Sequence, residues 1–82
     1  MRVVTLYGRP ECHLCDDARA ILLRVRDEVD FELVERDIER DDDLFRRYLE
    51  RIPVVAIDGE EAFELFVDEA ELRRRLAIVG RR

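Results

Sequence analysis

Two cysteines separated by two residues are the feature of this sequence that most directly suggests chemistry. Cys12 and Cys15, with His13 and Leu14 between them, are the only cysteines in the chain. Thiols at this spacing can close a small disulfide ring. Disulfide exchange needs a thiolate that attacks a disulfide sulfur and a second thiol close enough to resolve the mixed disulfide. The pair therefore predicts thiol–disulfide exchange, with Cys12 and Cys15 as the catalytic residues.

Metal binding is the main alternative for the same side chains. Zinc sites in proteins take four ligands, whereas this stretch offers only Cys12, His13 and Cys15. Because His13 adjoins Cys12, the imidazole and the two thiolates cannot easily share one tetrahedral site. We therefore predict redox chemistry rather than a metal site within one chain. Two alternatives stay open: metal or iron–sulfur binding through Cys12 of two chains, and a binding module whose dithiol is idle.

The neighbours of Cys12 act on the pKa of its thiol in opposite directions. A helix N-terminus and a protonated His13 would both stabilise the thiolate and lower that pKa. Asp16 and Asp17 would repel the thiolate and raise it. We expect an intermediate reduction potential from these opposing effects. An equally good interpretation of His13 is a solvated side chain without a tuning role.

The flanking segments should place the cysteines where a strand leads into a helix. Residues 2–7 are largely β-branched and aromatic, which is typical of a buried strand. After the cysteines, apolar residues recur at helical spacing and predict a helix over about residues 13–28. Residues 30–36 alternate apolar and charged side chains and predict a second strand near a sheet edge. This order of elements forms a right-handed crossover with parallel strands.

The middle of the chain predicts a second helix that ends at a proline. Any of the aspartates at 41–43 can cap this helix, and apolar residues at helical spacing continue it from Leu44 to Ile52. Pro53 cannot continue the helix and excludes the helical conformation for Ile52. Residues 54–57 are all apolar and predict a buried third strand.

A hairpin and a third helix complete the predicted fold. Asp58 and Gly59 are a strong hairpin signal, and residues 60–66 return as an antiparallel strand with Ala62 on the opposite face from Phe63. Asp68 is the expected cap of the last helix. The predicted fold class is α/β, in the order β-α-β-α-β-β-α. A four-stranded mixed sheet, with its first strand between the second and third, is sandwiched by three helices, the first and third on one face.

Size and charge limit the function further. The chain has 82 residues, enough for a single domain over residues 1–82, and its formal net charge is −6. This charge argues against nucleic acid or an anionic membrane as a partner. No apolar run has the length and flanks of a signal peptide or of a membrane span. We therefore expect a cytoplasmic protein, in which two close cysteines are catalytic or metal-binding rather than a structural staple.

Three segments of the sequence resemble the glutaredoxin-like branch of the thioredoxin-like superfamily. Residues 7–15 (YGRPECHLC) are similar to the strand, basic residue and dithiol of that branch. Residues 52–55 (IPVV) resemble the segment that carries its cis-proline, and residues 58–59 resemble its hairpin turn. The likeness covers almost the whole chain, and a C-x-x-C beside a βαβ pattern is typical of a thioredoxin-like redox motif.

The resemblance implies a role for each matching residue. Cys12 would be the exposed attacking thiol, and Cys15 the more buried resolving thiol on the first helical turn. Pro53, in the cis form, would place the backbone of Ile52 beside Cys12, where a disulfide substrate pairs with it as an added strand. Arg9 stands where the family often has lysine and would help to hold an anionic partner or the thiolate.

The resemblance also implies partners. Protein disulfides would be the substrates, and glutathione or a flavoprotein disulfide reductase would donate electrons, with no resident cofactor. The chain departs from the family in two places. The dipeptide between the cysteines is His-Leu rather than Pro-Tyr, and residues 65–68 (LFVD) lack the glycine pair that lets glutathione approach the backbone, which puts glutathione as a co-substrate in question. The predicted substrate-binding residues are Arg9, His13, Ile52 and Pro53.

Overall fold

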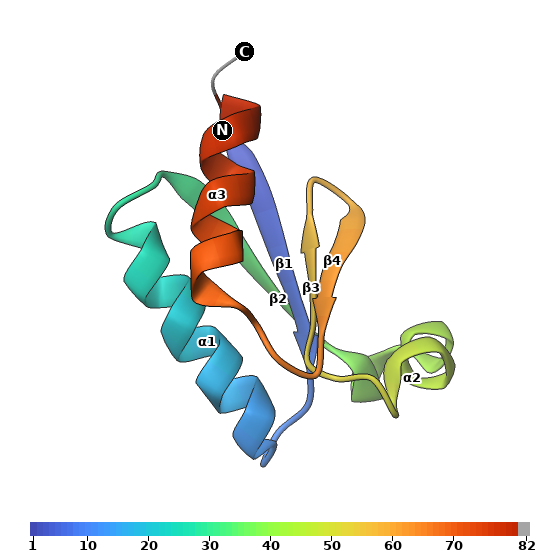
Figure 1. Cartoon of the computed structure of the whole chain (residues 1–82). Helices are drawn as coiled ribbons and strands as arrows, with labels where there is room; N and C mark the ends of the chain where they lie inside the picture. Colours follow the sequence, from blue (N-terminus) through green and yellow to red (C-terminus); the bar gives the residue numbers. More distant parts are fainter. Residues whose placement is uncertain (81–82) are drawn as a thin grey trace.

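The predicted order of elements is present, with one short 3₁₀ helix added. The computed structural model describes residues 1–80, and the side chains of residues 1–77. None of the helices it describes is long and apolar enough to cross a membrane. Figure 1 follows the chain through β1 (Arg2–Gly8), α1 (His13–Arg26), β2 (Phe31–Asp37), η1 (Ile38–Arg40), α2 (Asp42–Tyr48), β3 (Val54–Ile57), β4 (Glu60–Glu64) and α3 (Glu69–Gly80).

The four strands form one mixed sheet in the order β2-β1-β3-β4. β1 pairs in parallel with β2 on one side and antiparallel with β3 on the other, and β4 continues antiparallel at the edge. The parallel pair is joined through α1, as expected for a βαβ unit. The predicted central position of the first strand and edge position of the second are both confirmed.

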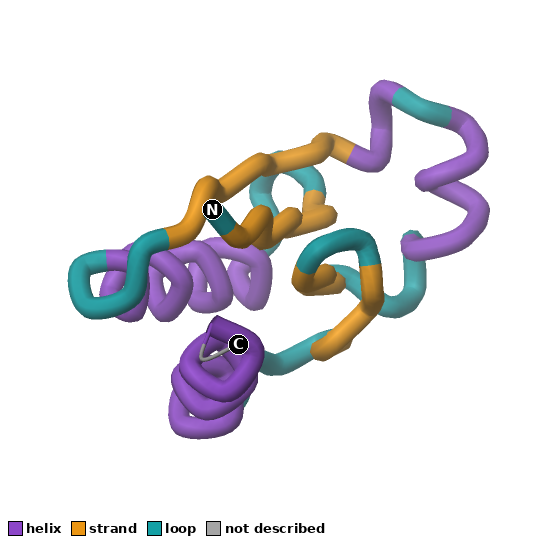
Figure 2. The backbone as a smooth tube through the Cα atoms, turned by 90° about the horizontal axis from the view of Figure 1, so that it is seen from above, coloured by secondary structure: helices purple, strands orange, loops and turns teal. Residues whose placement is uncertain are grey.

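The side chains of β1 and β3 divide the core into two parts. Val4 and Leu6 of β1 pack with residues of α1 and α3, whereas Tyr7 packs with Tyr48 and Val54 beneath α2 and η1. Successive side chains of a strand point to opposite faces, so the alternation along β1 supplies both parts. Figure 2 shows α1 and α3 on one side of the sheet and α2 on the other, as predicted.

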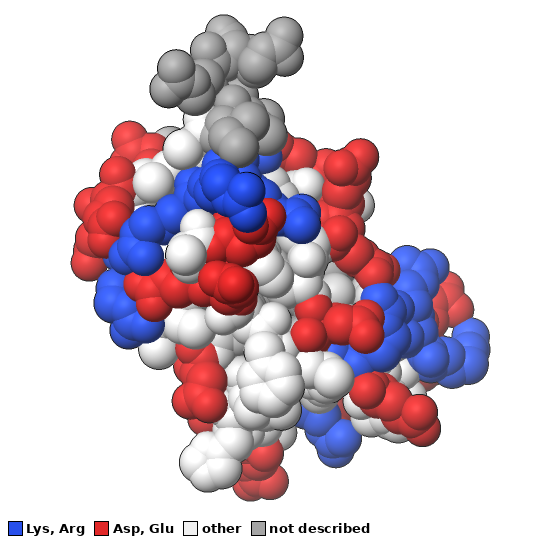
Figure 3. Space-filling model, in the orientation of Figure 1, with Lys and Arg blue, Asp and Glu red and all other residues white. Residues whose placement is uncertain are grey.

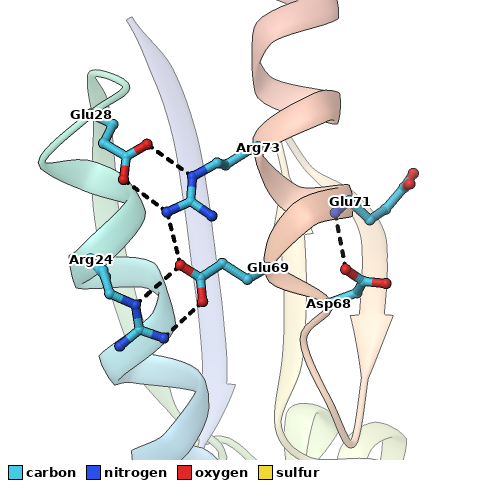
Figure 4. A network of polar contacts seen from close by, with 6 residues as sticks. All are labelled: Arg24, Glu28, Asp68, Glu69, Glu71 and Arg73. Carbon is cyan, nitrogen blue, oxygen red and sulfur yellow. Dashed lines mark hydrogen bonds and ion pairs between the residues drawn. The ribbon is translucent and has the colours of Figure 1, made fainter.

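A network of ion pairs joins α1 to α3. Acidic and basic side chains are interspersed over the upper surface (Figure 3), and the network is drawn in Figure 4. Arg24 donates two hydrogen bonds to the Glu69 carboxylate, at 2.8 and 3.1 Å. Arg73 pairs with Glu28 at 2.8 Å and with Glu69 at 2.9 Å. The bonds from Arg24, followed by those from Arg73, lower the pKa of Glu69 to about 2.

Two helix caps follow the prediction. Among the three candidate aspartates, Asp41 is the cap of α2, and its Oδ1 accepts hydrogen bonds from the N–H groups of Asp43 at 2.9 Å and Leu44 at 3.2 Å. Asp68 Oδ1 accepts from the Glu71 N–H at 3.1 Å at the start of α3. Each carboxylate satisfies an N–H that has no partner within the helix.

The connection between β2 and α2 differs from the prediction. Residues 38–40 form η1 because the Ile38 side chain is fully buried, and because Asp37 Oδ1 accepts a hydrogen bond from the Glu39 N–H at 2.9 Å. α2 ends at Tyr48 rather than near residue 52. A turn follows it, in which the Arg51 N–H donates to the Tyr48 carbonyl at 2.8 Å.

The predicted alternation along β4 is wrong. A register shift in the pairing with β3 makes Ala62 an extra residue in the strand, which is a β-bulge. Ala62 and Phe63 consequently pack against the same part of the core, beneath α1 and α3. β4 ends at Glu64, two residues earlier than predicted, and Leu65 adopts a left-handed φ of 70°.

Candidate active site

Cys12 and Cys15 lie at the N-terminus of α1 and are joined as a disulfide. Cys12 is the N-cap residue, and the Cα atoms of the two cysteines are 5.2 Å apart. The Cys12 Sγ accepts a hydrogen bond from the Cys15 N–H at 3.1 Å. This sulfur occupies the place where other helices have a serine or aspartate oxygen. It therefore lies at the positive end of the helix dipole, which favours a thiolate.

The two sulfurs differ in accessibility. Cys15 is 1% exposed and belongs to the buried residues of α1, whereas Cys12 is partly exposed. A thiolate can attack a substrate disulfide only if the disulfide can come into contact with it. An incoming disulfide therefore meets Cys12 first. Cys15 then lies directly behind it, within bonding reach.

Gly8, the last residue of β1, makes room for the buried cysteine. A Cβ atom at position 8 would lie 2.9 Å from the Cys15 Sγ and 3.2 Å from the Cys15 Cβ. Any larger residue there would push Cys15 or the strand out of place. Sequence reasoning missed this role. The signal for it was a glycine that ends a β-branched strand just before the dithiol, since a glycine in a strand often marks a close approach.

Pro53 lies at the same end of the sheet. The antiparallel register pairs Tyr7 of β1 with Val54 of β3, so the next pair of facing positions is Gly8 and Pro53. The peptide bond between Ile52 and Pro53 is cis. The dithiol and the cis-proline therefore both lie next to the last residue of β1.

The backbone next to the cis-proline is paired on one side only. The Leu65 N–H donates to the carbonyl oxygens of Pro53 at 2.8 Å and Arg51 at 3.2 Å. Ile52 lies between these two residues, and no backbone hydrogen bond of the described residues 1–80 involves its N–H or C=O. An extended peptide added at Ile52 would find both a donor and an acceptor.

The other two predicted binding residues, Arg9 and His13, are exposed. The Arg9 guanidinium lies 2.7 Å from the Glu39 carboxylate of η1, so its charge is compensated within the chain. Asp16, one of the two aspartates beside the dithiol, is likewise paired, with Arg19 at 2.9 Å. In the structure Arg9 therefore points toward η1, where its guanidinium is already paired with a carboxylate of the same chain.

A cleft of about 270 Å³ lies between the β1–α1 turn and the end of β2. Charges of both signs line it, among them Arg19 and Glu35, which are hydrogen-bonded to each other at 2.8 Å. Neither cysteine lines this cleft. Within residues 1–80, no three His, Cys, Asp or Glu side chains are grouped as the ligands of one metal ion would be.

Comparison with known proteins identifies the family. The sequence profile of the glutaredoxin-like domain (DUF836) matches residues 3–77, a range that includes both cysteines and the cis-proline. The chain belongs to the glutaredoxin-like domain family. The resemblance inferred from residues 7–15 and 52–55 is thereby confirmed.

Solved structures place this glutaredoxin-like domain among thioredoxin-like folds. A structural-genomics protein from Nitrosomonas europaea is 31% identical, with a TM-score of 0.81 over 92% of this chain and 91% of that one. Another, from X. campestris, is 33% identical, with a TM-score of 0.77 over 92% of this chain and 96% of that one. Chloroplastic thioredoxin z is 15% identical, with a TM-score of 0.80 over 100% of this chain and 80% of that one. No curated protein matches the sequence.

The segment between β4 and α3 of this glutaredoxin-like domain is apolar and then acidic. Leu65 is bonded to the backbone of the cis-proline, and Phe66 is 69% exposed. Glu69 and Glu71 follow in the first turn of α3. Leu65 and Phe66 therefore present large side chains at the dithiol end of the sheet, in a segment where the resemblance to glutathione-using relatives would call for glycines.

Proposed function

We propose that this glutaredoxin-like domain is a thiol–disulfide oxidoreductase that reduces disulfides in other proteins. The observation that carries the proposal is the asymmetry of the dithiol. Cys12 is partly exposed at the N-terminus of α1. Cys15 is buried one turn further along, and its N–H donates a hydrogen bond to the Cys12 sulfur. An attacking thiol must be open to its substrate, and a resolving thiol must be close but shielded.

The reaction consists of two exchanges. In the reduced protein the Cys12 thiolate attacks one sulfur of a substrate disulfide, whose S–S bond breaks as the other sulfur leaves with the electron pair and takes up a proton. Cys15 then loses its proton, and its sulfur attacks the Cys12 sulfur in the mixed disulfide. The second substrate thiol leaves and is protonated in turn. Two electrons have passed to the substrate, and the Cys12–Cys15 disulfide remains.

Two groups of the chain assist the first exchange. The Cys15 N–H, which lies 3.1 Å from the Cys12 sulfur, stabilises negative charge on that sulfur together with the helix dipole. The unpaired backbone of Ile52 beside the cis-proline aligns the substrate chain as a short added strand. His13, exposed next to Cys12, borders the same approach.

The disulfide form must be returned to the dithiol by an electron donor. We propose a protein donor of the flavoprotein disulfide reductase class rather than glutathione. The Arg9 guanidinium is already paired with Glu39, so the carboxylates of glutathione meet little positive charge there. Residues 65–68, which follow β4, also lack the glycines that would let glutathione approach the backbone. A reducing cytoplasm is the compartment that suits such a dithiol.

Serine variants of each cysteine test the proposal. Reduction of insulin by dithiothreitol is followed with and without catalytic amounts of the protein. Wild type should accelerate the reaction, and Cys12→Ser should give the rate of dithiothreitol alone. Cys15→Ser should accumulate a mixed disulfide with the substrate, visible as an adduct on Cys12 by mass spectrometry. Full activity of Cys12→Ser would refute the assignment.

The same preparations decide between the alternatives for the dithiol. A wild-type protein that does not accelerate insulin reduction, with either glutathione or a flavoprotein reductase as donor, would favour a binding module with an idle dithiol. Stoichiometric metal, or the visible absorbance of an iron–sulfur cluster after purification without oxygen, would instead favour a carrier that binds through Cys12.

A further inference from the structure

Large apolar side chains are exposed at the end of the sheet that carries the dithiol and the cis-proline. Of the five exposed large hydrophobic residues among those described, three are Leu14 at 36%, Leu65 at 38% and Phe66 at 69%. Leu14 lies between the two cysteines, and the Leu65 N–H is bonded to the carbonyl of Pro53. We call these three residues the docking surface. In Figure 3 an uncharged area lies in the lower middle of the molecule, with acidic side chains beside and below it, in the region where Figure 1 places the start of α1 and the β4–α3 segment.

The exposure of Phe66 serves no packing purpose within the chain. Its neighbour Val67 packs against the core beneath α1 and α3, whereas Phe66 belongs to neither part of the core. Covering such an exposed apolar side chain with another molecule removes it from water and is favourable in free energy. Phe66 directly follows Leu65, whose N–H is hydrogen-bonded to the Pro53 carbonyl at the dithiol end of the sheet, so the disulfide-bearing partner is the molecule that would cover it.

The charges around the docking surface are negative. Glu11 adjoins Cys12, Asp17 lies one helical turn after Leu14, and Asp68 follows Phe66 by two residues. Among the residues that the structure describes, no arginine lies within ion-pair distance of these three carboxylates, whereas thirteen other ion pairs are present. The rim of the surface therefore keeps its negative charge for a partner.

The basic residues near this surface do not offset that charge. Arg9 is paired with Glu39 at 2.7 Å, and Arg51 is paired with Glu64 at 2.8 Å and also with Glu61. A second copy of the chain would bring the same acidic rim and a net charge of −6, and glutathione would bring its own carboxylates. Both occupants meet repulsion, whereas basic groups meet attraction.

We infer that the substrate is a protein whose disulfide is flanked by apolar and basic side chains, which the docking surface and its acidic rim select. The inference rests on the proposed function and assigns it a substrate class. The exchange itself is unchanged: the reduced dithiol loses two electrons and two protons, and the substrate disulfide becomes two thiols. Phe66 and Leu65 contribute by covering apolar side chains of the substrate. The carboxylates of the rim contribute by pairing with basic side chains of the substrate.

Three cyclic disulfide peptides that differ only in the residues flanking the cysteines test this inference. One carries leucine and arginine, the second serine and arginine, and the third leucine and glutamate. The pre-reduced protein is mixed with each peptide, and single-turnover rate constants are measured, so no electron donor is needed. Wild type should reduce the leucine–arginine peptide about tenfold faster than the serine–arginine peptide, since burial of one leucine side chain is worth roughly that factor. It should also reduce the leucine–arginine peptide faster than the leucine–glutamate peptide, because the acidic rim attracts arginine and repels glutamate.

Variants separate the apolar from the charged contribution. Phe66→Ser should bring the ratio of leucine–arginine to serine–arginine rates close to one. The double change Glu11→Gln and Asp17→Asn should bring the ratio of leucine–arginine to leucine–glutamate rates close to one. High salt should have the same effect on this second ratio in the wild-type protein. Leu23→Ser removes a side chain on α1 that is 45% exposed and should leave both ratios at their wild-type values.

The failures are distinguishable. If the protein reduces bis(2-hydroxyethyl) disulfide but treats the three peptides alike, or if Phe66→Ser keeps the wild-type apolar ratio, the docking inference is overturned and the oxidoreductase assignment stands. If neither the small disulfide nor any peptide is reduced, the proposed function fails, and the inference fails with it.

Discussion

Gly8 and Cys15 are in such close contact that a Cβ on Gly8 would stand 2.9 Å from the Cys15 sulfur. The end of the central strand and the first turn of α1 meet there without a side chain between them. The contact holds the buried sulfur against the sheet and directly behind Cys12. The geometry of the dithiol therefore depends on a residue that performs no chemistry itself.

Gly8→Ala should lower both the stability and the reductase activity. The added methyl group must displace Cys15 or the strand, and overpacking of this kind costs about 1–3 kcal/mol. Urea unfolding and the single-turnover rate with bis(2-hydroxyethyl) disulfide measure the two effects. Gly59→Ala is the matched control. A Cβ there meets no atom within 4 Å, but φ is +89°, so stability should fall through backbone strain while the rate stays at the wild-type value. A Gly8→Ala variant with the wild-type rate would contradict this account.

Glu69→Gln should destabilise the protein at neutral pH and have little effect at pH 2. Hydrogen bonds from Arg24 and Arg73 lower the pKa of Glu69 from 4.5 to about 2 in the folded protein. The stability that its ionised form contributes is therefore present above pH 4.5 and is lost as the pH falls toward 2. Thermal unfolding midpoints at the two pH values measure this contribution.

The control for Glu69 is Glu50→Gln, which changes an exposed carboxylate that follows α2. It should leave the midpoint nearly unchanged at both pH values. If Glu69→Gln lowered the midpoint equally at pH 7 and pH 2, the loss would be due to packing, and the ion-pair network of Figure 4 would not be the link between α1 and α3.

Several elements were predictable because their determinants are local in sequence. β3 spans residues 54–57 because Pro53 precedes it and the Asp58–Gly59 turn follows it. α3 begins where Asp68 can cap it. The alternation of β2, with one polar face, correctly indicated an edge strand. In each case neighbouring residues decide the structure through sterics, capping or the period of the strand.

Other features depend on contacts between distant parts of the chain and were missed. The bulge at Ala62 is set by pairing with β3 and by the core beneath α3, and η1 forms because Ile38 is drawn into the core beneath α2. At the site, the dithiol was evident from its spacing. The pairing of Arg9 with Glu39, thirty positions away, was not evident, because such a pairing needs the folded structure.

That pairing predicts that Glu39→Gln should release Arg9 for anionic substrates. The freed guanidinium can then attract a carboxylate near the dithiol, so reduction of oxidised glutathione should become about two- to threefold faster, in line with the strength of exposed ion pairs. Single-turnover rates measure the change. Glu32→Gln, an exposed carboxylate on β2, should have no such effect. An unchanged rate in Glu39→Gln would mean that Arg9 does not act on the substrate.

The central claim is that Cys12 attacks and Cys15 resolves, and the reactivity of each thiol in the reduced protein tests it most directly. The protein is reduced, treated with limiting iodoacetamide at neutral pH, and mapped by mass spectrometry over time. Cys12 should be alkylated at least about tenfold faster than Cys15, because Cys12 is partly exposed at the helix N-terminus and Cys15 is buried. Equal rates, or faster alkylation of Cys15, would contradict the claim.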